Sequence, residues 1–76
     1  MYFMTDNITS VVLERSPTEL YKILKFEGLV SSGAEAKLAI ANGLVRVNDE
    51  IETRKRKKIV AGDTIKFSEY SLQIRE

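Results

Sequence analysis

The chain has 76 residues, and its 12 basic and 11 acidic side chains leave a formal net charge of +1. This length suits one small domain, and a hydrophobic fraction of 43% is too high for a disordered chain. There is no cysteine and no histidine, which excludes disulfides, thiolate catalysis, cysteine-ligated zinc and histidine-based acid–base chemistry.

The first clear element is a helix that follows an N-terminal arm, residues 1–15. A strand is an equal alternative for part of this arm, because the apolar residues 11–13 lie inside a candidate segment at 8–14. Ser16 as the cap, Pro17 at the first helical position and Glu19 three residues after Ser16 form a capping box. The apolar side chains that follow share one helical face: Leu20, Ile23 and Leu24.

A second helix with the same signals follows directly. Gly28 is expected to end the first helix, and Gly43 the second. Ser32 and Glu35 form another capping box at the start of the second helix. Small and apolar residues at helical spacing predict that this helix packs closely on the first: Ala36, Ala39 and Ile40.

After Gly43 the hydrophobic period changes to two. Val45 and Val47 are predicted to point inward and Arg46 outward. Asn48-Asp49 is a two-residue hairpin signal, because both residue types tolerate positive φ, and residues 50–53 return as the partner strand. Two further strands are expected at 64–67 and 71–75, joined by a loop at 68–70. Helices followed by strands indicate an α+β domain.

The most charged part of the chain lies inside this fold. We call residues 54–58 the basic stretch; its five consecutive cations are Arg54, Lys55, Arg56, Lys57 and Lys58. Residues 37–58 carry seven basic and three acidic groups, so the positive charge is local. Five cations cannot be buried unpaired, and we therefore expect the basic stretch to be a surface connection. It either contacts an anionic partner or serves only as a solvated loop.

Two runs of sequence resemble a known family. They are GLVSSGAEAKLAIANGLVRVNDE, at 28–50, and IVAGDTIKF, at 59–67. Both are similar to the S-four RNA-binding domain, also called the αL motif, and the chain resembles its small stand-alone bacterial form, the ribosome-associated YbcJ-like proteins. The resemblance implies one domain over residues 1–76, with the core motif at about 16–67 and two packed helices before a hairpin and short strands.

The resemblance also implies where RNA would be contacted. The basic stretch would supply the main positive field, while Lys37 and Arg46 would complete one continuous face and fix the register. Ser32 is expected to cap the second helix and to present backbone N–H groups to a phosphate. The full set of predicted RNA-binding residues is Ser32, Lys37, Arg46, Arg54, Lys55, Arg56, Lys57 and Lys58, with Lys22 and Lys25 as candidate rim contacts.

Two residues depart from the family pattern. Gly33 stands where the family usually has an arginine, and Asp49 where the hairpin usually has glycine. The basic stretch is therefore expected to carry binding that other members share with the second helix.

The remaining aromatic and acidic residues have simpler expected roles. Tyr70 is considered for base stacking because it falls in a predicted loop, although core-edge packing is favoured for it as for the other aromatics: Tyr2, Phe3, Tyr21, Phe26 and Phe67. The acids of the hairpin, Asp49, Glu50 and Glu52, are expected to form an exposed edge and not a metal site.

These observations predict a non-catalytic protein that docks on structured RNA, with ribosomal RNA or the ribosome as the partner. The alternative is a protein-interaction module whose basic face binds an acidic protein. No metal and no cofactor are expected. No apolar run reaches the roughly 20 residues of a membrane span, and no secretory signal pattern is present, so a cytoplasmic monomer is expected.

Overall fold

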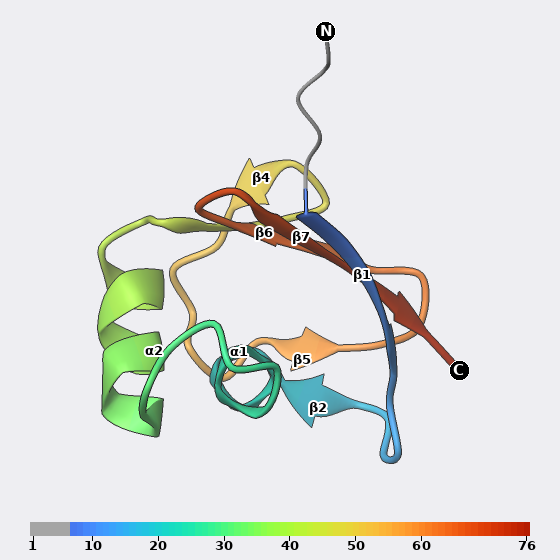
Figure 1. The fold of residues 1–76 in the computed structure, drawn as a ribbon. Helices are drawn as coiled ribbons and strands as arrows, with labels where there is room; N and C mark the ends of the chain where they lie inside the picture. Colours follow the sequence, from blue (N-terminus) through green and yellow to red (C-terminus); the bar gives the residue numbers. More distant parts are fainter. Residues whose placement is uncertain (1–6) are drawn as a thin grey trace, which may run out of the picture.

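The structure is a computed structural model that describes residues 7–76. Two helices cover one face of a five-stranded sheet, and a two-stranded sheet lies beside the helices (Figure 1). The predicted α+β fold is therefore confirmed. In chain order the elements are β1 (Asn7–Val12), β2 (Thr18–Glu19), α1 (Leu20–Phe26), α2 (Gly33–Ala41), β3 (Val45–Val47), β4 (Glu50–Ile51), β5 (Lys58–Ile59), β6 (Thr64–Phe67) and β7 (Tyr70–Arg75).

The larger sheet has the strand order β1-β7-β6-β3-β4. Strand β1 pairs with β7 in parallel, and the other neighbours are antiparallel. The strand alternative for the N-terminal arm is thus confirmed, although the strand begins and ends earlier than the candidate segment at 8–14. Val11 is buried and Val12 exposed, as a strand with one covered face requires. The remaining six residues of the arm, with Tyr2 and Phe3, lie outside the described residues.

The predicted start of the first helix is wrong. Thr18 and Glu19 form β2, which pairs with β5, and the helix begins at Leu20 without a side-chain cap. The N–H groups of Leu20 and Tyr21 donate instead to the carbonyl oxygens of Lys57 and Lys55, at 2.9 and 3.1 Å. Backbone carbonyls of the basic stretch therefore satisfy N–H groups at the helix start, which the capping box was expected to satisfy.

The hairpin and its flanking strands follow the sequence signals closely. Val45 and Val47 are buried and Arg46 is exposed. Asn48 and Asp49 adopt the predicted positive φ, at 53° and 70°, which matches the twist of a tight hairpin. The partner strand is shorter than predicted, because only Glu50–Ile51 pairs with β3.

The connection between the last two strands is also shorter than predicted. Tyr70 opens β7 opposite Phe67, so it lies in a strand and not in a loop. Phe26 is wrong as a core residue as well, because 70% of its surface is exposed. Tyr21 and Phe67 do pack against the edge of the core, as expected.

The core fills the space between the larger sheet and the helices. Its helical side is built from the predicted faces of α1 and α2, including the two alanines that let the helices approach. The fully buried large side chains are Leu20, Leu24, Ile40, Val45, Ile59, Ile65 and Leu72. Within residues 7–76, neither helix has the length and hydropathy needed to cross a membrane.

Candidate functional site

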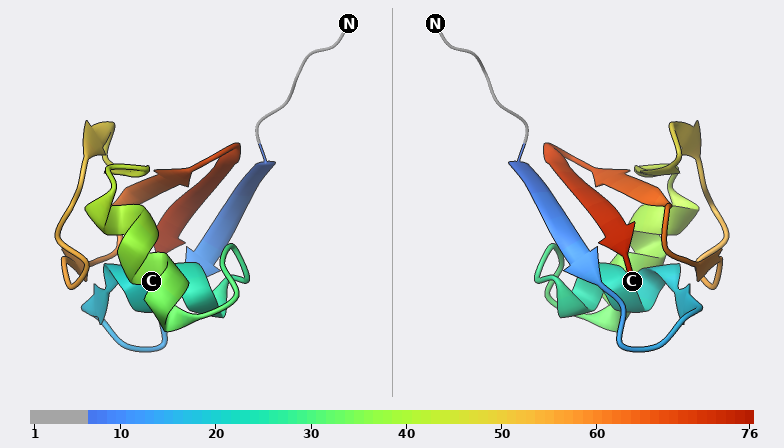
Figure 2. Two further views of the ribbon diagram at one scale, coloured as in Figure 1. Left: turned by 90° about the vertical axis from the view of Figure 1, so that its left-hand side faces the viewer. Right: turned by 90° about the vertical axis from the view of Figure 1, so that its right-hand side faces the viewer.

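The basic stretch is fixed to the body of the protein at both ends. It runs from the β3–β4 hairpin along one side of the molecule to the start of α1 (Figure 2). Its backbone accepts the two hydrogen bonds from the start of α1, and the N–H of Lys57 closes a turn onto the carbonyl of Arg54 at 3.1 Å. Lys58 then enters β5 opposite Glu19. The carbonyl groups of Lys55 and Lys57 thus face the helix, and most side chains of the segment are exposed.

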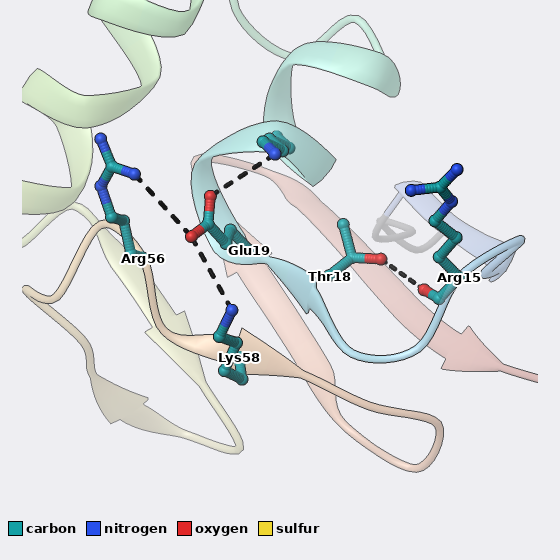
Figure 3. A network of polar contacts seen from close by, with 6 residues as sticks. Arg15, Thr18, Glu19, Arg56 and Lys58 are labelled. Carbon is teal, nitrogen blue, oxygen red and sulfur yellow. Dashed lines mark hydrogen bonds and ion pairs between the residues drawn. The ribbon is translucent and has the colours of Figure 1, made fainter.

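Glu19 draws three cations from two segments together (Figure 3). Its Oε1 lies 3.6 Å from the Nζ of Lys22, and its Oε2 lies 3.9 Å from both Nη1 of Arg56 and Nζ of Lys58. The Glu19 side chain is only 17% exposed, whereas the three cations project into solvent. Each pair contributes little to stability, but one carboxylate cannot neutralise three cations. A surplus of positive charge therefore remains at this point.

The ring of Tyr21 extends this group to the second helix. The Nζ of Lys37 lies 4.6 Å from the ring centroid, with the Cζ of Arg56 at 5.8 Å and the Nζ of Lys22 at 6.0 Å. Such distances are within the range of cation–π attraction. We name these six residues the Glu19–Tyr21 cluster: Glu19, Tyr21, Lys22, Lys37, Arg56 and Lys58. Lys37 and the basic stretch are thus brought together, as predicted.

Glu19 and Tyr21 were not predicted as site residues. From the sequence, Glu19 is predicted to belong to a capping box and Tyr21 to be a core-edge aromatic. Their roles depend on Lys37, Arg56 and Lys58, which lie 16 or more residues away in the chain. No signal in the neighbouring sequence marks such a convergence.

Arg54 makes a closer ion pair than Arg56 and Lys58, because Glu52 binds its guanidinium through both carboxylate oxygens. Its Nε and Nη2 donate to the two carboxylate oxygens of Glu52, at 2.9 and 3.1 Å, and its backbone N–H donates to the same side chain at 3.0 Å. Hydrogen bonds from Arg54 lower the pKa of Glu52 to about 2. Much of the Arg54 charge is therefore already compensated within the protein.

This pair should make stability depend on pH. Because the folded pKa of Glu52 lies below its ordinary value of 4.5, the pair stabilises the fold above that pH and loses its effect as the pH falls toward 2. We expect the parent to exceed the Glu52→Gln variant in free energy of unfolding by about 1 kcal/mol at neutral pH. Urea denaturation across this pH range should show the difference vanishing at the acidic end. A difference that stays constant would contradict the assignment.

Arg46 lies away from the cluster. Val45 and Val47 face the helices, so Arg46 points from the other face of the sheet, where Lys66 of β6 is its cross-strand neighbour. Lys66 in turn pairs with Asp49, whose Oδ1 lies 2.9 Å from its Nζ. We call this side the helix-free face. The prediction that Arg46 and Lys37 share one continuous surface is therefore wrong, because the sheet lies between these two residues.

Ser32 is the cap of α2, as predicted. Its Oγ accepts a hydrogen bond from the N–H of Glu35 at 3.1 Å. The Glu35 carboxylate accepts from the N–H and Oγ of Ser31, both at 2.8 Å, so the second half of the box is displaced by one residue. These hydrogen bonds lower the pKa of Glu35 and keep it anionic at the helix start. A fixed negative charge there opposes the phosphate contact that was expected at Ser32.

Ser32→Ala should accordingly separate capping from binding. Loss of the cap should reduce the free energy of unfolding by about 1 kcal/mol, measured by urea denaturation. Affinity for RNA should stay within about twofold of the parent when both are folded, since a twofold change is only about 0.4 kcal/mol. A selective loss of RNA affinity at unchanged stability would restore Ser32 as a contact.

The two rim candidates have different surroundings. Lys22 belongs to the Glu19–Tyr21 cluster, whereas Lys25 lies exposed in the last turn of α1. The backbone carbonyls of Lys55 and Lys57 accept the hydrogen bonds from the first N–H groups of α1, and both residues are neighbours of Arg56 in the sequence.

Among residues 7–76, no group of three or more carboxylates is placed to hold a metal ion.

Comparison with known proteins agrees with this architecture. Residues 11–75 match the sequence profile of the S4 domain. YbcJ of Escherichia coli (strain K12) and YbcJ of Shigella flexneri are each 55% identical to the chain over 56 residues, which is 74% of this chain and 80% of theirs. The solution structure of Escherichia coli YbcJ, described as revealing an αL motif involved in RNA binding, superposes with a TM-score of 0.71 at 45% identity and covers 100% of this chain and 98% of that one. The chain belongs to the S4 domain family.

Proposed function

We propose that this protein binds structured RNA, and ribosomal RNA in particular, through the Glu19–Tyr21 cluster and the adjoining basic stretch. One observation carries the proposal: four cations from three separate segments are gathered around one carboxylate and one ring. The family and the description of the Escherichia coli YbcJ structure support RNA as the ligand.

The proposed mechanism is docking on the phosphate backbone. Cations held close together repel one another, and a polyanion relieves this repulsion while releasing its own condensed counterions. Contacts of this kind fix the position of an RNA but do not read its bases, so selectivity would come from RNA shape. The role would be non-catalytic. We propose that the protein acts in the cytoplasm as a monomer.

Binding to ribosomal RNA fragments and to a duplex of random sequence, at two salt concentrations, tests the proposal. If about four phosphates are contacted, the slope of log affinity against log salt should be roughly −3 on a single-stranded scale. Stronger binding to the ribosomal fragments would support ribosomal RNA, and equal binding would leave only general RNA affinity.

A second measurement separates RNA from the alternative, an acidic protein partner. Co-sedimentation with ribosomes should be lost when ribonuclease removes accessible RNA. Retention of the protein on ribonuclease-treated particles, together with no affinity for the isolated fragments, would instead favour a protein contact.

A further inference from the structure

We propose that Tyr21 is the positioning residue of the RNA-binding surface. Its ring would hold Lys37 of α2 and Arg56 of the basic stretch at a fixed separation, so that RNA meets a preformed pair of cations. This inference rests on the proposed function, and it assigns to an aromatic residue the task of joining two segments that carry charge.

The location of Tyr21 suits this task. Its N–H donates to the carbonyl oxygen of Lys55, which fixes the residue against the basic stretch. The residue is partly buried and packs against the core. The start of α2 lies close to the ring as well, because a Cβ placed on Gly33 would be 3.7 Å from Cε2 of Tyr21. The ring is therefore in contact range of its own helix, α2 and the basic stretch.

The charges around the ring need such a support. Lys37, Arg56 and Lys22 all lie within 6.0 Å of one centroid, so like charges stand close together. Without an attractive group between them, flexible cationic side chains would separate into solvent. The negative face of an aromatic ring attracts a cation without neutralising it. Tyr21 can hold these side chains while leaving their full charge available to phosphates.

Glu19 and Tyr21 would then position different sets of cations. The carboxylate of Glu19 approaches Lys22, Arg56 and Lys58 but reduces the net charge of the cluster. Lys37 is the cation nearest to the ring, and it comes from a different helix. Tyr21 thus connects the charge of α2 to that of the basic stretch, and loss of its ring should affect Lys37 most.

The test compares Tyr21→Phe, which keeps the ring, with Tyr21→Leu, which removes it. Tyr21→Phe should bind RNA within about twofold of the parent. Tyr21→Leu should bind about five- to tenfold more weakly, and its salt slope should flatten by roughly 0.7, equivalent to one phosphate contact. The matched control is Tyr70→Leu, which replaces an exposed tyrosine on β7. This variant should bind like the parent.

A double-variant series distinguishes positioning from a purely structural role. If Tyr21 acts through Lys37 and Arg56, Tyr21→Leu should have little further effect in a chain that already carries Lys37→Gln and Arg56→Gln. An undiminished effect on that background, or parent-like binding by Tyr21→Leu alone, would overturn the positioning role. If neither glutamine change weakens binding by the parent chain, the proposed function at this surface fails as well.

A spectroscopic measurement on the parent does not depend on how a variant folds. The terminal methylene protons of Lys37 should be shifted upfield by the ring current of Tyr21, relative to those of Lys25. The shift should persist in Tyr21→Phe. Lys37 resonances equal to those of Lys25 in the parent would show that the ring does not hold this side chain, and would overturn the proposal.

Discussion

Replacing Lys37, Arg56 and Lys58 together by glutamine should lower the affinity for structured RNA by about 100-fold, at roughly 1 kcal/mol for each lost phosphate contact. All three belong to the Glu19–Tyr21 cluster. Its single acid, Glu19, cannot neutralise all of the cations, so positive charge remains for an RNA phosphate. The salt slope should flatten by about 2, as expected when three phosphates are no longer neutralised on a single strand. Fluorescence anisotropy at a series of salt concentrations measures both quantities.

The chain offers a control that changes net charge by the same amount. Arg46, Lys66 and Arg75 are exposed on β3, β6 and β7 and belong to the helix-free face. Their joint replacement by glutamine should leave RNA affinity within a fewfold of the parent. An equal loss in both triple variants would show that overall charge, and not the cluster, determines binding.

Of the single substitutions described, Ile59→Ala should reduce the free energy of unfolding most. Ile59 is 0% exposed and lies in β5, directly after the basic stretch, where it pairs with Thr18 of β2. Truncating a fully buried isoleucine costs about 2–5 kcal/mol, through lost apolar contact and the cavity left behind. A domain of this size has a total stability of about 4–11 kcal/mol, so a large share would be lost.

The neighbouring residue provides the control for this prediction. Val60 is 43% exposed, and Val60→Ala should cost less than about 1 kcal/mol. Urea denaturation of the two variants compares them directly. Similar small losses in both would show that Ile59 does not anchor the basic stretch to the core.

Much of the fold follows from local signals in the sequence. The apolar faces of both helices, the hairpin turn at Asn48-Asp49 and the alternation of Val45, Arg46 and Val47 all depend on residues close together in the chain. The start of α1 does not, because its first N–H groups are satisfied by carbonyls more than 30 residues away. The parallel pairing of β1 with β7 is equally long-range.

The site shows the same division. The charge of the basic stretch is visible in the sequence, and so is the resemblance to the S4 domain. The compensation of Arg54 by Glu52 and the separation of Arg46 from Lys37 require the folded arrangement. The shared contacts of Glu19 and Tyr21 also arise only when β2, α1, α2 and the basic stretch come together.

Mapping the RNA contact by nuclear magnetic resonance tests the central claim most directly. Titration of a ribosomal RNA fragment into labelled protein should perturb the amide and side-chain resonances of Tyr21, Lys22, Lys37 and residues 54–58. Resonances of Arg46, Lys66 and the outward residues of β7 should change little. Perturbations concentrated on the helix-free face, with the Glu19–Tyr21 cluster unchanged, would contradict the account.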